Sequence, residues 1–341
     1  MNQAEIDTVV IIKSKTRLEL LTEKFNTAEQ AKFYIAQSNM TFLSKKSMSA
    51  GGGKKPAALS KVAKDTIEKQ AFDLYQKEHD TFLLNFNKVV NTSQKLLKVK
   101  VLEKSFLPNY LFSDNEMVVV VGQDGLVANT AKYVKNNPIL GVNPDVSRYD
   151  GVLLPFSPDT INFGIYNVLN NTYKYKLVTM AKAELNDGQQ LLGFNDLFIG
   201  PASHISARYR IEYKNVSENQ SSSGIIITTG AGSTGWFSSL LNMTKRVSGF
   251  FTGTVPELQN RLDWEANQLY FIVREPFLSR NSFINVTTGI IDNQFQLEIE
   301  SQMPENGIIF SDGVEADFLK FNSGSIATIS IAGQKAKLVI S

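Results

Sequence analysis

Residues 117 to 143 read Met117-Val-Val-Val-Val-Gly-Gln-Asp-Gly-Leu-Val-Ala-Asn-Thr-Ala-Lys-Tyr-Val-Lys-Asn-Asn-Pro-Ile-Leu-Gly-Val-Asn143. The stretch opens on an apolar run, Met117–Val121, which is typical of a strand buried on both faces of a parallel sheet. A glycine-bearing loop follows at 122–125, then a predicted helix over Leu126–Lys135 and a second predicted strand over Ile139–Asn143. Strand, loop, helix and strand within about thirty residues predict a βαβ unit.

The residues before this unit also alternate between strand and helix. β-branched residues make Thr8–Ile12 a predicted buried strand, and Lys98–Leu102 shows strand-like alternation. Helical spacing of apolar residues predicts helices over Arg17–Ile35 and Lys64–Leu97. Between these helices, consecutive glycines and flanking lysines near 45–64 predict a flexible solvated insertion, with a basic flap over a phosphate-bearing ligand as the alternative.

After about residue 160 the chain changes to a pattern of strands. Alternation of apolar and polar residues predicts half-buried strands at Ser206–Tyr213 and Gln294–Glu300. Further strands are expected at Gly224–Thr229, Leu269–Val273, Ile326–Ile331 and Ala336–Ile340. We therefore expect a Rossmann-like α/β domain with a parallel sheet over 1–160, and an antiparallel β-rich domain over 161–341. The closing segment is a candidate to return to the first domain.

Composition limits the chemistry that the chain can perform. The 341 residues include no cysteine, which excludes disulfides, thiolate metal sites and cysteine nucleophiles. Only two histidines are present, His79 and His204, so a three-histidine metal site is excluded. The net charge is +2, and the dispersed basic residues of the first third do not form the stripe that nucleic acids require. Because no apolar run reaches the roughly 18 residues of a membrane span and no signal-peptide layout is present, we expect a cytoplasmic protein.

The loop Gly122-Gln-Asp-Gly125 is placed where α/β proteins bind ligands, between the carboxyl end of a buried strand and the start of a helix. Glycines allow backbone N–H groups to approach phosphate oxygens, and a helix N-terminus adds partial positive charge. Asp124 between them could accept a proton from an attacking hydroxyl or orient a magnesium ion. The alternative is an ordinary Asp-Gly turn.

Two later segments also offer polar groups to a ligand. The segment Thr228-Thr-Gly-Ala-Gly-Ser-Thr-Gly-Trp236 combines glycines, hydroxyls and an aromatic ring, and we expect Ser233 or Thr234 to cap the helix that follows. The Trp236 ring could stack on a planar group of a ligand, or it could simply be buried. Asn195-Asp196 places a carboxamide beside a carboxylate, either at a site or in a turn.

Taken in order, these segments resemble the motifs of the NAD kinase family. The matching segments are Gly122–Gly125, Gly141–Asn143, Asn195-Asp196, Gly232–Trp236 and Asp312-Gly313. The mitochondrial-type branch is the closer match. The segments that resemble it are Lys13-Ser-Lys-Thr-Arg17, Gly141–Asp145 with Arg148, Phe198–Gly200 with Ser206–Arg208, Ser222–Gly224 and Arg274–Pro276. The resemblance thus covers nearly the whole chain.

The resemblance implies an NAD kinase-like fold and transfer of the γ-phosphoryl group of ATP to the 2′-hydroxyl of the adenosine ribose of NAD, giving NADP. Asp124 would take the proton of that hydroxyl, and Gly122, Gln123 and Gly125 would line the phosphates. The residues implied to contact NAD are Asn143, Asn195, Asp196, Gly232, Ser233, Thr234, Gly235, Trp236, Ser239 and Asp312. Mg²⁺ would accompany ATP without dedicated metal ligands, and a homodimer or higher homo-oligomer is implied.

Two departures from the family pattern bear on the activity, and two alternative functions remain open. Gln123 stands where the family has a second glycine, and Leu126 stands where a threonine usually follows the loop. The Gln123 side chain would either narrow the approach of the backbone to phosphate or donate an amide hydrogen bond. A catalytically silent regulator that binds NAD or NADP is therefore one alternative. The other is a lipid kinase of the diacylglycerol or sphingosine type, which shares the glycine-aspartate loop.

Overall fold

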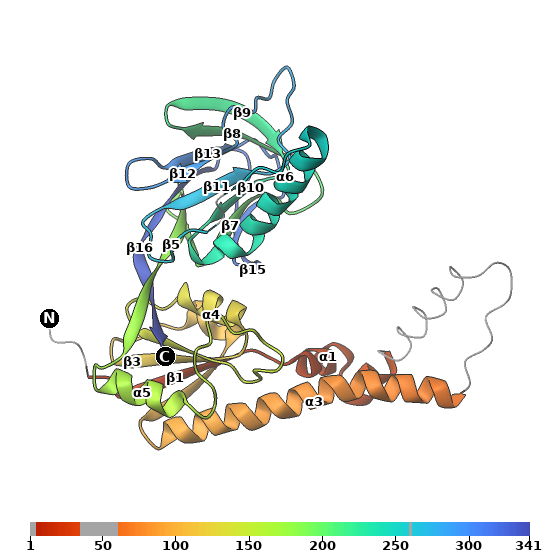
Figure 1. Cartoon of the computed structure of the whole chain (residues 1–341), viewed down its shortest axis with the longest axis vertical. Helices are drawn as coiled ribbons and strands as arrows, with labels where there is room; N and C mark the ends of the chain where they lie inside the picture. Colours follow the sequence, from red (N-terminus) through yellow and green to blue (C-terminus); the bar gives the residue numbers. More distant parts are fainter. Residues whose placement is uncertain (1–4, 35–60, 259–260) are drawn as a thin grey trace.

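The computed structural model describes residues 5–34, 61–258 and 261–341, and it has two lobes (Figure 1). The N-lobe is an α/β layer structure, and the C-lobe consists of two packed β-sheets with one long helix on the outside. Two long strands, β5 (Lys174–Leu185) and β16 (Ile326–Ile340), run between the lobes. The glycine-rich insertion expected near 45–64 lies, as far as residue 60, outside the residues that the structure describes.

A parallel sheet forms the centre of the N-lobe. Its strands, in spatial order, are β2 (Lys98–Glu103), β1 (Thr8–Lys13), β3 (Glu116–Val121) and β4 (Pro138–Val142). Every residue of β3 and β4 is buried, because helices cover both faces of the sheet and leave no face for solvent. The long apolar run of β3 is therefore explained by its central position.

The side chains of β1 and β3 alternate between two helical layers. Val9 and Val119 face α3 (Lys61–Gln94) and α5 (Ile161–Leu169), whereas Val10 and Val120 face α4 (Asp124–Ala131). α5, which begins just after the boundary expected at residue 160, packs on this sheet through Ile161, Ile165 and Val168. α4 lies on the side of the sheet that faces the C-lobe (Figure 1).

Two helices differ in extent from the sequence expectation. The helix expected over Arg17–Ile35 is interrupted, since α1 ends at Phe25 and Asn26 has a left-handed backbone with φ 63°. α1 starts with a capping box between Thr16 and Glu19, which fixes its first turn. The helix expected from Leu126 begins two residues earlier, so Asp124 and Gly125 lie in its first turn.

The C-lobe is a sandwich of antiparallel sheets. One sheet contains β6 (Gln190–Gly193), β8 (Ala207–Tyr213), β9 (Val216–Ser222) and β13 (Leu297–Ser301), together with parts of β5 and β16. The other has the order β12 (Thr288–Ile291), β11 (Leu269–Val273), β10 (Ile225–Thr228), β7 (Asp196–Pro201), β14 (Gly307–Ser311) and β15 (Val314–Lys320). Their inner faces share one core that includes Tyr209, Phe271 and Ile299.

The shared strands make one continuous sheet between the lobes. Ala327–Ile329 of β16 pairs with β13 in the C-lobe, whereas Lys337 and Leu338 pair in parallel with β4 in the N-lobe. β5 pairs with β16 along its length, with a bulge between Ile331 and Lys335. The two strands expected at Ile326–Ile331 and Ala336–Ile340 are thus one bulged strand, and the closing segment lies beside the first lobe.

One helix flanks the C-lobe sandwich. α6 (Trp236–Thr252) follows the short 3-10 turn η2 (Ala231–Thr234), and it lies outside the sheet that contains β10 and β11 (Figure 1). It ends at Gly253, whose φ is 73°, a left-handed value that favours glycine. No helix in the described ranges is long and apolar enough to cross a membrane.

Candidate functional site

Three motifs that are distant in sequence meet at one edge of the C-lobe. β7 lies between β10 and β14, so the start of β7 is adjacent to the end of β10 and to the end of β14. Asp196 is opposite Thr228 in one pairing, and Leu197 is opposite Ser311 in the other. The structure therefore brings Asn195-Asp196, Thr228–Trp236 and Asp312-Gly313 together, as a shared site would require.

Asp312 organises the start of β7 through its carboxylate. It forms, with Gly313, the two-residue turn between β14 and β15, and both have positive φ (54° and 68°), as in a type I′ turn. Its Oδ1 accepts hydrogen bonds from the backbone N–H groups of Asn195 (2.6 Å) and Asp196 (3.3 Å), and its Oδ2 accepts one from Phe194 (3.0 Å). The resemblance implies that Asp312 contacts NAD; in the structure its carboxylate shapes the Asn195-Asp196 segment through these hydrogen bonds.

Gly232 allows the Thr228–Trp236 segment to pack directly against the backbone of the Asn195-Asp196 segment. A Cβ at this position would lie 1.9 Å from the carbonyl oxygen of Asn195, so only glycine fits. Thr229 completes the contact: its N–H donates to the Asn195 carbonyl at 2.9 Å, and its Oγ1 donates to the Phe194 carbonyl at 2.5 Å. The two segments therefore hold each other's backbone in place.

The remaining residues of the Thr228–Trp236 segment divide into buried and accessible groups. Ser233 is buried, and its Oγ donates to the Gly230 carbonyl (2.7 Å) and accepts from the Leu262 N–H (3.3 Å). The expected side-chain cap by Ser233 or Thr234 is wrong, because the N-cap of α6 is Gly235, which has no side chain to donate or accept. The residues of this region that are exposed are Thr234, Gly235 and Ser239.

Trp236 is half-buried against the outer face of the sheet. Its ring stacks on Phe198 with centroids 5.7 Å apart and an interplanar angle of 15°. The guanidinium of Arg274 lies over the Trp236 ring, 5.5 Å from its centroid, in a cation–π contact. Trp236 thus already has planar partners within the protein.

The N-lobe loop is set in the first turn of α4. Gln123 is the N-cap with φ −94°, an ordinary extended value, so its side chain fits without backbone strain and is exposed. Asp124 Oδ1 accepts a hydrogen bond from the backbone N–H of Leu153 at 2.6 Å, and its Oδ2 has no partner among the described residues. Apart from the adjoining residues and backbone of its own helix, a Cβ at Gly125 would meet no protein atom within 4 Å, so the space there is open to a ligand.

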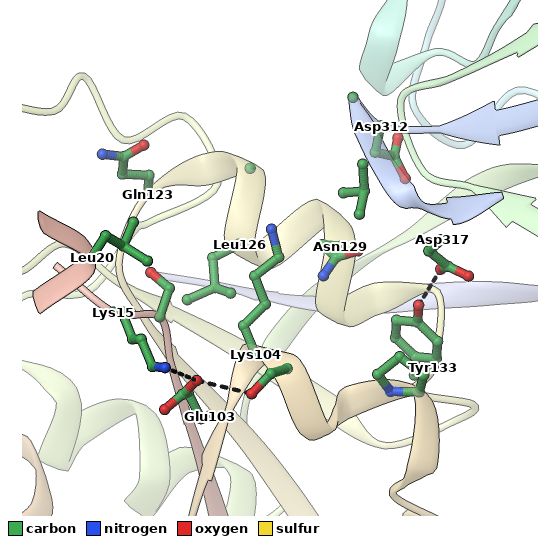
Figure 2. A pocket seen from close by; sticks show the side chains of 16 residues that line it. Lys15, Leu20, Glu103, Lys104, Gln123, Leu126, Asn129, Tyr133, Asp312 and Asp317 are labelled. Atoms are coloured by element: carbon green, nitrogen blue, oxygen red, sulfur yellow. Dashed lines mark hydrogen bonds and ion pairs between the residues drawn. The ribbon is translucent and has the colours of Figure 1, made fainter. Parts of the chain in front are cut away.

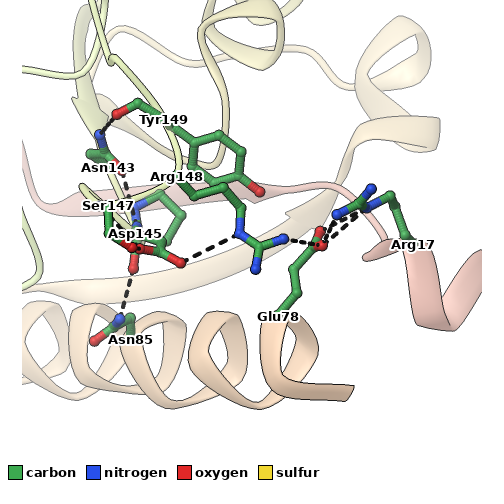
Figure 3. A network of polar contacts seen from close by, with 9 residues as sticks. Arg17, Glu78, Asn85, Asn143, Asp145, Ser147, Arg148 and Tyr149 are labelled. Carbon is green, nitrogen blue, oxygen red and sulfur yellow. Dashed lines mark hydrogen bonds and ion pairs between the residues drawn. The ribbon is translucent and has the colours of Figure 1, made fainter. Parts of the chain in front are cut away.

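Asn143 belongs to the loop that supports Asp124 and not to the C-lobe cluster. Its amide donates to the Tyr149 carbonyl and accepts from the Asp145 N–H, both at 3.0 Å, and the residue is buried. Figure 3 shows this loop joined to α3 through Arg148, which pairs with Glu78. The side chain expected to contact NAD therefore fixes the loop that carries Leu153.

Arg17, at the start of α1, contacts the same Glu78 carboxylate as Arg148 (Figure 3). Its guanidinium pairs with Glu78, which is buried, and lies over the Tyr75 ring at 5.1 Å from the centroid. Asp145 is the second partner of Arg148, at 3.6 Å. This network ties the start of α1, α3 and the loop after β4 together, and it involves the Lys13–Arg17 motif that the sequence singled out.

A pocket of about 860 Å³ lies between the two lobes (Figure 2). From the N-lobe it is lined by the start of α4 and by residues at the carboxyl ends of β1 and β2; from the C-lobe it is lined by the β14–β15 turn. Of the expected site residues, it includes Gln123, Gly125 and Asp312. The pocket is also lined by residues that the motifs do not predict as site residues, among them Lys104, Asn129, Tyr133, Asp317 and Lys15, the last of which belongs to the Lys13–Arg17 segment. For Asn129 a signal was present, since it is a polar residue within the apolar run of α4.

Buried charges connect the walls of this pocket. Lys132, one residue beyond α4, donates to Ser311 Oγ at 2.8 Å and lies 3.9 Å from Asp312 Oδ2 and 3.7 Å from Asp317 Oδ2. Burial lowers the pKa of Lys132 and raises that of Asp312, while their mutual attraction opposes both shifts. Burial, together with the charge of Asp312, raises the pKa of Asp196 to about 7. Within the described ranges, no group of three or more histidine or acidic residues is arranged to hold a metal ion.

An α/β lobe with a parallel sheet, joined through two shared strands to a β-sandwich, is the NAD kinase-like fold that the sequence predicts, and a solved structure confirms it. Yeast NADH kinase in complex with NADH superposes with a TM-score of 0.54 and 13% identity, covering 99% of this chain and 84% of that one. The NAD kinase from Archaeoglobus fulgidus in complex with ATP aligns with a TM-score of 0.49 and 16% identity over 74% of this chain and 88% of that one. No known family model matches the chain, and no curated protein is similar to it in sequence.

Proposed function

We propose that this protein is an NAD kinase, which transfers the γ-phosphoryl group of ATP to the 2′-hydroxyl of the adenosine ribose of NAD or NADH. The observation that carries the proposal is a pocket shared by the first turn of α4 and the Asp312 turn, beside the joined Asn195 and Gly232 segments. The likeness in fold to yeast NADH kinase supports it. A cytoplasmic location is a proposal that rests on the sequence, and a homo-oligomeric state is a proposal that rests on the resemblance to the family.

Asp124 is the proposed proton acceptor in this reaction. The Leu153 N–H fixes its Oδ1 at 2.6 Å and leaves Oδ2 free to receive the hydroxyl proton. The 2′-oxygen forms a bond to the γ-phosphorus, the bond from that phosphorus to the β–γ bridging oxygen breaks, and ADP leaves with the electron pair. Such a transfer depends mainly on positioning and charge stabilisation, so a carboxylate and well-placed N–H groups are sufficient protein chemistry.

Magnesium is proposed to enter as its complex with ATP, and it would neutralise charge on the donor. Mg²⁺ takes oxygen ligands and is commonly held by substrate phosphates with one or two carboxylates. Because no group of histidine and acidic residues in the described ranges is arranged to hold a metal ion, the phosphates of ATP and water would hold Mg²⁺, and Asp124 Oδ2 stays free to accept the hydroxyl proton. The Gly125 backbone, which has open space before it, lies where the donor phosphates can approach the N-terminus of α4.

The direct test is to incubate the purified protein with Mg²⁺, ATP and NAD, and to detect NADP with an NADP-specific dehydrogenase. We expect the wild type and the exposed-site control Asp73→Asn to form NADP, and Asp124→Asn to lose turnover while it still binds NAD in calorimetry. Wild-type turnover by Asp124→Asn would refute the assignment of the proton acceptor. If the wild type binds NAD but forms neither NADP from NAD nor NADPH from NADH, the silent regulator replaces the kinase.

A further inference from the structure

The helix α4 divides its residues between the protein core and the pocket. Val127, Ala128 and Ala131 pack in the core of the N-lobe. Gly125 and Asn129 are four residues apart, so they share one face of the helix, and both line the pocket. The pocket face of α4 therefore carries a glycine at its first turn and an amide one turn below it.

Asn129 is buried without the partners that a buried amide needs. The residue is 3% exposed, its Oδ1 has no hydrogen-bond partner, and its Nδ2 makes no hydrogen bond to any described residue. Buried side-chain amides are normally hydrogen-bonded, and an unpaired one destabilises the fold. Figure 2 shows this side chain among those that line the pocket, so a ligand there is placed to satisfy it.

Lys104 is the second group in the pocket without a partner. It is the first residue of the 3-10 helix η1 (Lys104–Asn109), it is half-buried, and no carboxylate pairs with it in the part of the chain that the structure describes. In Figure 2 its side chain reaches from the start of η1 toward Leu126 and Asn129.

The other charged groups that line this pocket have partners within the protein. Lys15 pairs with Glu103 at 3.7 Å, and Asp317 accepts from the Tyr133 hydroxyl and lies 3.7 Å from Lys132. Lys104 therefore supplies positive charge that the pocket leaves unneutralised, which suits an anionic ligand.

We propose that this pocket holds the nucleoside triphosphate donor, with Asn129 hydrogen-bonded to its nucleoside part and Lys104 paired with its phosphates. The inference rests on the proposed kinase function and deepens it, because it assigns the residue that distinguishes a nucleotide from a simple polyphosphate. The volume of about 860 Å³ is in the range of small-molecule sites. Gly125 leaves room for the phosphates at the N-terminus of α4, one turn from Asn129.

The test measures binding without turnover. Calorimetry would use a non-hydrolysable ATP analogue and inorganic tripolyphosphate as separate probes, on wild type, Asn129→Leu and Lys104→Met. We expect Asn129→Leu to weaken the ATP analogue about tenfold and to leave tripolyphosphate within about twofold. Lys104→Met should weaken both probes by about tenfold or more, because it removes a charge that either ligand would contact. Lys98→Met, an exposed lysine on β2, is the matched control and should change neither affinity.

Thermal unfolding without ligand separates a ligand-binding role of Asn129 from a structural one. Leucine replaces an unpaired buried amide with an apolar group of similar size, so Asn129→Leu should melt at or above the wild-type temperature. If Asn129→Leu does not fold, Asn129→Ser tests the same loss of binding with a smaller side chain. Unchanged affinity for the ATP analogue in the folded Asn129 variant overturns the proposal, and so does an equal loss for both probes. The proposed function fails on different evidence, the absence of NADP from the wild type.

Discussion

The ammonium group of Lys132 lies 3.9 Å from Asp312 Oδ2, and the two side chains, 2% and 1% exposed, form a buried ion pair between the lobes. Lys132 follows α4, the helix that carries Asp124 at its start, and Asp312 holds the backbone N–H groups of Phe194, Asn195 and Asp196. Lys132 is therefore attached to the helix of the proposed proton acceptor, and Asp312 shapes the segment proposed to bind NAD. The pair fixes the relative position of the two halves of the site.

Removing the positive member of this pair should destabilise the protein. Lys132→Met leaves the Asp312 carboxylate buried without its counter-charge, and such a change typically lowers the free energy of unfolding by about 3–5 kcal/mol. Because Asp312 also positions Asn195, the KM for NAD should rise more than kcat falls. Urea unfolding at pH 7 and steady-state kinetics measure the two effects. Lys135→Met, on the exposed surface beside it, is the control, and equal stability of the two variants would contradict this account.

Asp196 should make the stability of the protein fall between about pH 4 and pH 7. Its pKa is raised to about 7 in the folded protein, first by burial and then by the charge of Asp312, from an ordinary value of 3.8. In that interval the unfolded chain has lost the proton that the folded protein still holds, so the free energy of unfolding decreases as pH rises and levels off above pH 7. Asp196→Asn carries no such charge, and it should flatten this part of the profile and raise the melting temperature at pH 8.

Melting temperatures measured from pH 4 to pH 8 for wild type and Asp196→Asn test this directly. Asp114→Asn is the control, because Asp114 is exposed. Parallel profiles for the wild type and Asp196→Asn would show that the Asp196 carboxyl does not titrate in this interval.

The elements that the sequence predicts well are those whose pattern depends on local burial. Met117–Val121 is apolar throughout because both faces of the central strand are covered, and that can be read without knowing its neighbours. β16 could not be predicted as one strand, because the bulge between Ile331 and Lys335 breaks the alternation and only the pairing with β5 restores continuity. The break after Phe25 depends on the left-handed backbone of Asn26, which an asparagine permits but does not dictate.

The site was predictable where residues lie close together in the chain. The motifs around Asp124 and Asn195 carry their own short patterns, whereas the pocket between the lobes is lined by residues such as Lys104 from η1 and Asp317 from β15. Those residues come together only through the packing of the two lobes, so their spacing in the sequence does not predict that they share a pocket. The structural role of Asp312 was also hidden, because its carboxylate bonds to a backbone more than a hundred residues away.

Gly232 should tolerate no side chain. A Cβ there would lie 1.9 Å from the Asn195 carbonyl oxygen and 2.5 Å from its carbonyl carbon, and both are backbone atoms that cannot rotate away. Gly232→Ala should therefore push the two segments apart, lower the free energy of unfolding by about 1–3 kcal/mol or more, and weaken NAD binding. Gly188→Ala is a poor comparison because of its positive φ, so Gly333→Ala, which has open space around it, is the control. Urea unfolding of Gly232→Ala with wild-type stability would show that the close approach is not needed.

Gly125 should behave in the opposite way to Gly232, because the protein leaves its Cβ position empty. Apart from the adjoining residues and backbone of its own helix, no protein atom lies within 4 Å of that position, and the residue is in the first turn of α4. Gly125→Ala should therefore leave the free energy of unfolding unchanged or raise it by about 0.5–1 kcal/mol. If donor phosphates approach the backbone here, the added methyl group fills their space, and the affinity for a non-hydrolysable ATP analogue should fall about tenfold while NAD binding is retained. Calorimetry and urea unfolding on the same preparation measure both quantities. A stable Gly125→Ala protein with wild-type affinity for the analogue would place the phosphates elsewhere in the pocket, whereas a large loss of stability would mean that the fold, not the ligand, requires glycine at this position.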